Sequence, residues 1–261
     1  MTARARRAAA GRLERIGSFP LPGGRGERGV RVYLPPGPTP AGGRPLLVLF
    51  DGQNVFDDQP SFAGGWHAHA TVDRLGARAP IVVGVEHGHA SRIDELSPFA
   101  TRQSRGEAAS FVGWVAGEIV PALRRSLPIA PGPDAVVIGG SSMGGLAALF
   151  AALCFGGTFG GGAICMSPSF WLADRAILSL ASEAALPPGA RVYLDAGERE
   201  GRGHLAPLVR EAAERLFRRG CAPERLRLVV DSRGAHNERS WGRRLPGALR
   251  FFYGPARRPR G

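Results

Sequence analysis

Short apolar segments alternate with longer amphipathic ones along this chain, and that alternation limits the folds open to it. The apolar, β-rich segments are residues 29–34, 45–50, 80–85, 135–140, 161–166, 191–196 and 225–230. Each is apolar almost without interruption, which is typical of strands buried on both faces of a parallel sheet. Segments with helical spacing lie between them, at about 67–76, 105–126, 143–154, 171–185, 203–219 and 238–252. The alternation predicts a single α/β domain whose central, mostly parallel sheet is flanked by helices.

We predict that this domain covers residues 29–253. The segment 1–28 is basic and is predicted to be flexible, and residues 254–261 are predicted to form a basic C-terminal tail. Residues 29–44 are expected to contain an antiparallel strand followed by a Pro/Gly turn. Pro121 is expected to kink or divide the helix predicted at 105–126, because proline lacks the N–H that an inner helical turn uses.

The net charge of +12 comes from the two ends of the chain. Residues 1–31 and residues 243–261 each carry a net charge of +6, and the remainder is neutral. Basic ends attract phosphate backbones without specificity, but no basic segment interleaved with aromatic residues is present. We therefore predict solvated basic ends and no specific nucleic-acid partner.

The cysteines and the hydropathy of the sequence indicate in which cellular compartment the protein is expected. Cys154, Cys165 and Cys221 show no CxxC spacing, which argues against a disulfide framework or a zinc site and is typical of a reducing compartment. No apolar run approaches the roughly 18 residues of a membrane-spanning helix, and the basic start lacks the apolar stretch of a signal peptide. We predict a cytoplasmic protein without a membrane partner, and a homodimer is compatible with these features.

A Gly-x-Ser-x-Gly sequence follows one of the predicted strands and precedes a helix. Residues 135–138 are apolar, and residues 140–144 read Gly-Ser-Ser-Met-Gly. In this setting the motif is typical of a nucleophile elbow, whose serine stands on a strained turn at the edge of the sheet. We predict Ser142 as the nucleophile, with the Met143 backbone N–H donating to a developing oxyanion. The alternative is a turn in which Ser142 only caps the helix.

A serine nucleophile needs a general base, and in α/β-hydrolases the chain order is serine, acid, histidine. Two histidines follow Ser142. His236 lies in a loop after the last predicted strand, from which an imidazole can reach the edge of the sheet. His204 begins an amphipathic helix and is expected at the surface. The predicted base is therefore His236.

The acid is expected near the end of the strand predicted at 191–196. The sequence there offers Asp195, Glu198 and Glu200. Asp195 still belongs to the strand and is expected to serve structurally. Glu200 lies in the following loop, with freedom to reach the imidazole, so it is our prediction, and the other two carboxylates stay as alternatives.

Five sequence blocks occur in an order that resembles a known family. They are LFDGQNVFDD (49–58), GGSSMGG (139–145), MSPSFW (166–171), LDAGERE (194–200) and HNERSW (236–241). Together they are similar to the putative esterase family, the enterochelin-esterase-like and feruloyl-esterase-like branch of the α/β-hydrolases. The resemblance covers about 29 to 253, and five blocks in order are far more specific than any one of them.

The resemblance implies an α/β-hydrolase fold and a role for each matching residue. The family's serine, histidine and acid fall on Ser142, His236 and Glu200. Its second oxyanion donor, in the loop after the Asp-Gly pair, falls on the Gln53 backbone N–H. No cofactor is implied.

Three further side chains are candidates for binding substrate. Arg92 follows the third predicted strand, and its guanidinium would suit an anionic substrate group, but a salt bridge to Asp94 or Glu95 is the alternative. Trp66 and Trp171 are predicted either to border the pocket for the acyl or alcohol group or to lie in the core.

Two histidine pairs, His67 with His69 and His87 with His89, have the spacing that places both rings on one side of a strand. A metal site would need a third and a fourth ligand. We therefore interpret them as loop histidines near the rim of the pocket and predict no metal.

Three functions follow from these residues. The first is a serine esterase that hydrolyses a small-molecule carboxylic ester or thioester through an acyl-enzyme. The second is an acyltransferase that uses the same triad and an acceptor alcohol. The third is a catalytically silent binding protein on the same fold. Because every required residue type is present in order and no export signal is evident, we favour hydrolysis.

Overall fold

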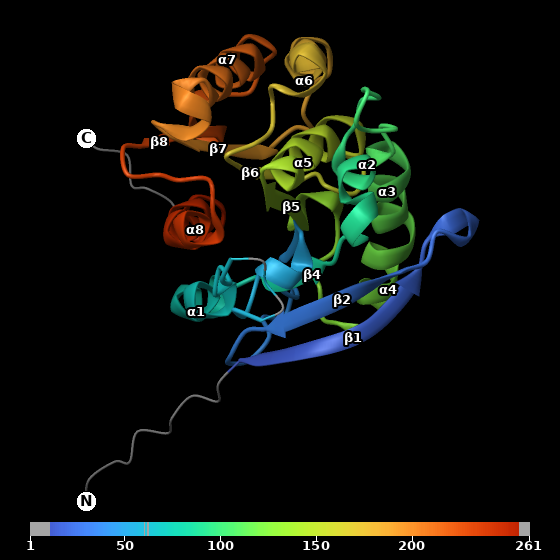
Figure 1. The fold of residues 1–261 in the computed structure, drawn as a ribbon. Coiled ribbons are helices and arrows are strands. Elements are labelled where there is room, and N and C mark those ends of the chain that lie inside the picture. The colour runs from blue at the N-terminus through green and yellow to red at the C-terminus, as the bar shows by residue number, and fades with distance from the viewer. Residues whose placement is uncertain (1–10, 60, 62, 256–261) are drawn as a thin grey trace, which may run out of the picture.

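An eight-stranded sheet forms the centre of the computed structural model, which describes residues 11–59, 61 and 63–255 (Figure 1). The strands of this described part are β1 (Arg12–Pro20), β2 (Glu27–Leu34), β3 (Leu46–Phe50), β4 (Ile81–Val85), β5 (Val136–Ser141), β6 (Gly162–Met166), β7 (Arg191–Gly197) and β8 (Leu226–Asp231). Their order in the sheet is β1-β2-β4-β3-β5-β6-β7-β8. The pairs β1–β2 and β2–β4 are antiparallel, and the remaining neighbours are parallel. The predicted α/β fold with a mostly parallel sheet is confirmed.

Helices cover both faces of the sheet (Figure 1). On one face lie α1 (Ala68–Val72) and α8 (Glu238–Tyr253). On the other lie α2 (Arg92–Leu96), α3 (Ala108–Trp114), α4 (Val120–Ser126), α5 (Met143–Cys154), α6 (Leu172–Glu183) and α7 (Leu205–Arg218). Because the carboxyl ends of the parallel strands share one edge, the loops that follow β3, β4, β5, β6, β7 and β8 meet there.

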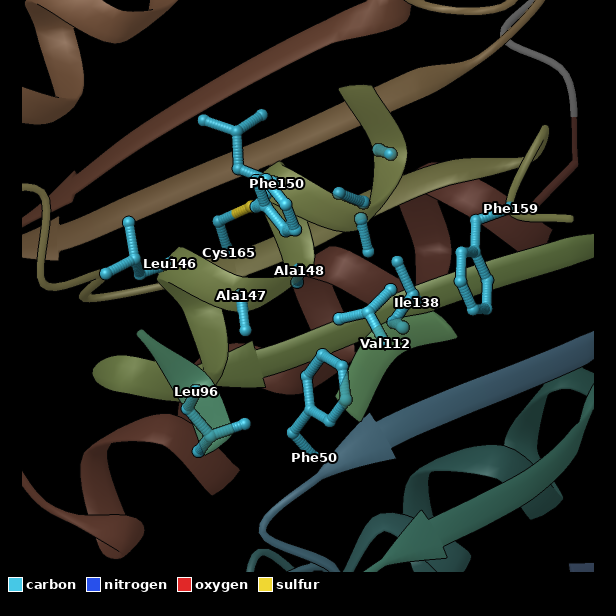
Figure 2. Close-up of a cluster of buried hydrophobic side chains, with 14 of the residues drawn as sticks. Phe50, Leu96, Val112, Ile138, Leu146, Ala147, Ala148, Phe150, Phe159 and Cys165 are labelled. Atoms are coloured by element: carbon cyan, nitrogen blue, oxygen red, sulfur yellow. The ribbon is translucent and has the colours of Figure 1, made fainter. Parts of the chain in front are cut away.

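The alternation of side chains along each strand divides the core in two. In β3, Leu46, Val48 and Phe50 pack toward α2–α7, whereas Leu47 and Leu49 pack toward α1 and α8. This explains why the central strands are apolar without interruption. The larger half of the core surrounds α5, which is buried along nearly its whole length (Figure 2). A helix that is apolar all round is stable only in such a position.

The N-terminal part of the sheet begins earlier than the predicted domain start at residue 29. Residues 12–20 form β1, an edge strand that pairs with β2, inside the segment predicted to be flexible. Its side chains alternate only weakly between exposed and half-buried, which hides a strand from sequence patterns. Residues 1–10 and 256–261, which belong to the predicted basic ends, lie outside the described part.

The basic ends are also less solvated than predicted. Arg28 is buried against Glu95, and Arg244 of α8 is buried among acidic groups of the sheet edge. The net charge of a segment does not reveal the pairing of individual side chains. Pro121 lies at the start of α4, and the helix passes through a π-helical turn over Val115–Ile119 just before it, so the predicted disturbance is present.

Candidate active site

Ser142 stands at the turn between β5 and α5 with a backbone conformation that few residues adopt. Its φ is 54° and its ψ is −118°, and its backbone N–H donates to the carbonyl of Met166 at 2.9 Å. The turn requires glycine on either side. A Cβ on Gly140 would lie 2.6 Å from the carbonyl carbon of Gly144, and a Cβ on Gly144 would lie 3.2 Å from Asp51. The strain at Ser142 is therefore imposed by close crossing of the backbone, as in a nucleophile elbow.

The hydroxyl of Ser142 faces an imidazole. Ser142 Oγ lies 3.0 Å from His236 Nε2 and 3.3 Å from Ser169 Oγ. His236 is in the loop between β8 and α8, and its ring meets that of Trp241 edge to face, with centroids 5.1 Å apart. Asn237 caps α8 by accepting the N–H of Ser240 at 3.0 Å, which fixes where the helix begins.

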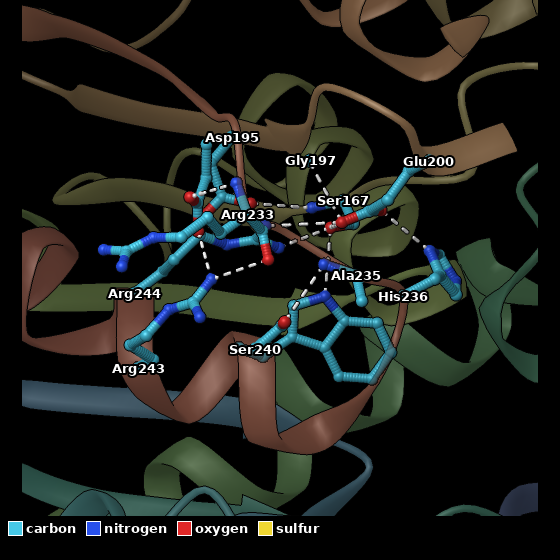
Figure 3. A network of polar contacts seen from close by, with 12 residues as sticks. Ser167, Asp195, Gly197, Glu200, Arg233, Ala235, His236, Ser240, Arg243 and Arg244 are labelled. Atoms are coloured by element: carbon cyan, nitrogen blue, oxygen red, sulfur yellow. Dashed lines mark hydrogen bonds and ion pairs between the residues drawn. The ribbon is translucent and has the colours of Figure 1, made fainter. Parts of the chain in front are cut away.

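The other nitrogen of this imidazole faces the Glu200 carboxylate. His236 Nδ1 lies 3.0 Å from Glu200 Oε2 (Figure 3). Glu200 is buried, with 4% of its surface exposed. Burial alone raises the pKa of this carboxyl, but hydrogen bonds to His236 and Ser167 and the charge of Arg244 together hold the pKa below its usual value. The carboxylate is therefore ionised at neutral pH, and it can orient the imidazole and stabilise its protonated form.

The two alternative acids lie elsewhere. Asp195 is fully buried at the end of β7, where its Oδ1 accepts the Ser167 N–H at 3.0 Å and its Oδ2 lies 3.2 Å from Arg244 Nε. Burial raises the pKa of Asp195 to about 7, although the charge of Arg244 opposes this. Glu198 is exposed. Neither carboxylate contacts His236 among the described contacts, and His204 is exposed at the start of α7.

Two backbone N–H groups are candidates for an oxyanion hole. Met143 is the first residue of α5, so its N–H has no acceptor within the helix. Gln53 lies in the short turn Gly52–Asn54 that follows β3. Asp51, just before this turn, has a left-handed φ of 56°, and its carboxylate lies against Gly144 of the elbow. The loop that contains Gln53 is thus packed on the N-terminus of α5.

Arg92 forms an ion pair with Asp51, a partner that was not predicted from the sequence. Its Nε and Nη2 lie 2.7 and 2.8 Å from the two carboxylate oxygens of Asp51. Burial lowers the pKa of this guanidinium, but the hydrogen bonds and charge of Asp51 more than offset that effect, so the pKa is raised. The predicted alternatives, Asp94 and Glu95, pair instead with Arg105 and Arg28.

The two tryptophans have opposite environments. Trp66 is buried, and its ring packs against that of Trp241 with centroids 6.3 Å apart, so it belongs to the core. Trp171 is 57% exposed at the start of α6, two residues after Ser169, whose N–H donates to the Ser142 carbonyl. Trp171 is followed by a left-handed turn over residues 173–175. Of the two tryptophans, Trp171 is the one whose ring is exposed.

The histidine pairs lie in separate surroundings. His67 pairs with Asp58 at 3.0 Å, and the ring of His69 lies beside Tyr33. The rings of His87 and His89 meet edge to face, with centroids 5.4 Å apart. Within the described ranges no group of three or more His, Cys, Asp or Glu residues is arranged to hold a metal ion. None of the helices described there is long and apolar enough to cross a membrane.

Comparison with protein families decides the relationship of the chain. The model of a family described as Putative esterase matches residues 24–252. The chain belongs to this esterase family. The resemblance seen in the five sequence blocks is therefore confirmed.

Individual relatives are distant. The uncharacterized protein YbbA of Bacillus subtilis (strain 168) is 25% identical over 247 residues, which are 89% of this chain and 95% of YbbA. The iron(III) enterobactin esterase of Dickeya dadantii (strain 3937) is 31% identical over 150 residues, 57% of this chain but only 32% of that esterase.

Solved structures share the fold. The BES protein from Bacillus cereus has a TM-score of 0.76 at 20% identity, covering 97% of this chain and 98% of its own. The enterobactin hydrolase IroE has a TM-score of 0.74 at 19% identity, covering 95% of this chain and 97% of its own. These likenesses support the α/β-hydrolase fold of the esterase family.

Several polar residues around the candidate site were not foreseen from the sequence. Ser167 and Arg244 both contact Glu200, and Ser169 contacts Ser142. The two serines lie in the MSPSFW block, directly after β6, so their place at the carboxyl edge of the sheet was a usable signal. Arg244 lies in the basic segment 243–261, for which we predict solvated side chains. Its spacing from Trp241, however, puts it on the apolar face of α8.

Proposed function

We propose that the protein is a serine esterase that hydrolyses carboxylic esters or thioesters through an acyl-enzyme. The observation that carries the proposal is the pair of contacts on opposite nitrogens of one imidazole. His236 Nε2 lies 3.0 Å from Ser142 Oγ, and His236 Nδ1 lies 3.0 Å from Glu200 Oε2. Membership of the esterase family supports a reaction on esters.

In the first half of the proposed reaction, Ser142 Oγ attacks the ester carbonyl carbon while His236 Nε2 takes its proton. The carbonyl oxygen becomes an oxyanion that accepts hydrogen bonds from the Met143 and Gln53 N–H groups. When the tetrahedral intermediate collapses, the bond to the leaving alcohol breaks and His236 gives the proton to that alcohol. The acyl group is then bound to Ser142.

In the second half, water replaces the alcohol. His236 accepts a proton from the water as its oxygen attacks the acyl carbon, and it returns that proton to Ser142 Oγ when the acid leaves. Throughout, the Glu200 carboxylate keeps the imidazole in the tautomer that has its proton on Nδ1 and stabilises the imidazolium.

The substrate side of the proposal rests on Trp171. Its exposed ring lies in the block that also provides Ser169, which contacts the nucleophile, so it is a surface for an apolar part of the ester. Arg92 is proposed to stabilise the oxyanion loop through Asp51, since both oxygens of that carboxylate are bound by its guanidinium.

A matched pair of serine variants tests the function. Hydrolysis of p-nitrophenyl acetate and butyrate would be measured for the wild type, Ser142→Ala and Ser141→Ala. Ser142→Ala should lower kcat by several orders of magnitude, because only binding and the oxyanion hole remain. Ser141 is buried in β5, so Ser141→Ala should have a mild effect.

Repeating the assay with a competing alcohol separates hydrolysis from acyl transfer. An esterase forms mainly the free acid, whereas an acyltransferase forms mainly the new ester. Absence of turnover on every ester, or a requirement for Ser141 in place of Ser142, contradicts the proposal.

A further inference from the structure

The two oxygens of the Glu200 carboxylate have separate sets of partners. Oε2 faces His236 Nδ1 at 3.0 Å. Oε1 lies 3.0 Å from the Gly197 N–H nitrogen, 3.0 Å from Ser167 Oγ and 3.3 Å from Arg244 Nη1 (Figure 3). Binding of Oε1 by these three groups fixes the rotation of the carboxylate and leaves Oε2 directed at the imidazole.

The hydrogen-bond direction at Ser167 follows from the chemistry of its partners. Trp241 Nε1 lies 3.0 Å and Arg244 Nη2 lies 2.6 Å from Ser167 Oγ. Indole and guanidinium groups only donate, so they use the two lone pairs of the hydroxyl. The single proton of Ser167 therefore goes to Glu200 Oε1. In this arrangement the hydroxyl is fully satisfied and has one orientation.

Arg244 is held in place by a second carboxylate. Its side chain is only 5% exposed, and its Nε lies 3.2 Å from Asp195 Oδ2. A buried guanidinium is stable only when its charge is balanced, and Asp195 contributes to that balance through an ion pair rather than a hydrogen bond. Its planar shape lets Nε, Nη1 and Nη2 reach Asp195, Glu200 and Ser167 at once, which the single ammonium of a lysine could not do in this geometry.

The first two turns of α8 connect this arrangement to the imidazole. Trp241 and Arg244 are three residues apart and therefore lie on one side of the helix. The Trp241 ring also contacts the edge of the His236 ring. Trp241 of this helix thus contacts the candidate base, His236. Arg244 of the same helix contacts the candidate acid, Glu200, both directly and through Ser167.

We propose that Ser167 and Arg244 are positioning residues for the catalytic acid: they bind Oε1 of Glu200 and thereby direct Oε2 toward His236. The inference rests on the proposed function, in which Glu200 is the acid of the triad. Neither residue contacts the reacting atoms. Their effect is on the geometry of the acid, where a misplacement of about 1 Å can cost about a hundredfold in rate.

A double-mutant cycle tests this role, with kcat and KM measured on a p-nitrophenyl ester. Arg244→Met should lower kcat by about ten- to a hundredfold, with little change in KM. In a Glu200→Gln background the same substitution should change kcat by no more than about twofold, because no ionised acid remains to be positioned. The control is Arg250→Met, which removes the same charge from an exposed position of α8 and should keep wild-type activity.

Ser167→Ala is a second variant for the same test. It replaces Arg244→Met in the double-mutant cycle if thermal unfolding shows that Arg244→Met does not fold. It should also lower kcat in the wild type but hardly in the Glu200→Gln background. A loss by the same factor in both backgrounds would mean a purely structural role and would overturn the inference, as would wild-type kcat in both Arg244→Met and Ser167→Ala. If Glu200→Gln itself keeps full activity, the assignment of the acid fails and the inference falls with it.

Discussion

Asp195 and Glu200 share the guanidinium of Arg244, yet their carboxyl groups differ in pKa because their other partners differ. Glu200 reaches the partly exposed His236 and accepts hydrogen bonds that hold its pKa down. Asp195 is enclosed between β6 and β8, and burial raises its pKa to about 7. One carboxyl is thereby suited to orienting an imidazole, and the other to a structural role.

The raised pKa of Asp195 predicts a pH dependence of stability. The folded protein keeps a proton on Asp195 at pH values where an unfolded aspartate, with a pKa of about 3.9, has lost it. Its contribution to the free energy of unfolding is fully present below about pH 4 and is lost as the pH rises toward 7. Asp195→Asn should remove this term.

Denaturant unfolding between pH 4 and 8 would measure this contribution of Asp195 to the free energy of unfolding. The free energy of unfolding of the wild type minus that of Asp195→Asn should fall as the pH rises from 4 to about 7 and then level off. A difference that is constant, or that grows with pH, would contradict a raised pKa at Asp195.

At the residue level, position along the chain is a good guide to which residues meet at the candidate site but not to all of their partners. The loop position of Glu200 and the placement of His236 after the last predicted strand were enough to select both residues. The contacts of Glu200 with Ser167 and Arg244 join two loops and a helix, and the choice of partners depends on how these pack. For the same reason the pairing of Arg92 with Asp51, rather than with the nearby Asp94 or Glu95, was not predictable.

The strand–turn–helix element around Ser142 depends on the absence of a side chain at Gly140, two residues before the serine. Gly140→Ala should destabilise the fold by about 1–3 kcal/mol and lower kcat, because the new Cβ would lie 2.6 Å from the backbone of Gly144. Gly117 is the matched control. It lies in the π-helical turn, and a Cβ there meets no atom within 4 Å outside its chain neighbours and its own helix backbone.

Gly117→Ala should leave stability unchanged or raise it by up to about 1 kcal/mol, since alanine loses less conformational entropy in a helix. Denaturant unfolding and the ester assay on both variants give the comparison. A Gly140→Ala variant with the stability and kcat of the wild type would show that the elbow is less tightly packed than described.

Strands with apolar sequences were predictable, and the polar strand β1 at one edge of the sheet was not. Strands β2–β8 begin and end close to the predicted residues, because their uninterrupted apolar segments are distinct from the flanking loops. β1 has polar and half-exposed side chains and gains its order from pairing with β2. Pairing between distant segments leaves no local pattern in a sequence.

At the scale of the whole molecule, the fold class follows from the alternation of elements, whereas the strand order does not. β4 lies between β2 and β3 in the sheet, an exchange that the order of elements along the chain does not reveal. The consequence for the site is nonetheless simple. Parallel strands bring the segments after β3, β4, β5, β6, β7 and β8 to one edge, and the candidate residues come from these segments. Cytoplasmic location and a homodimer stay predictions.

The central claim is that Ser142 is the nucleophile of a serine esterase. A fluorophosphonate probe, which reacts with an activated serine, would be incubated with the wild type, and the modified peptide would be located by mass spectrometry. We expect one adduct on Ser142, lost in Ser142→Ala and strongly reduced in His236→Ala, because the imidazole activates the hydroxyl. An adduct on Ser141, Ser167 or Ser169 in place of Ser142, or no adduct in a protein that hydrolyses esters, would contradict it.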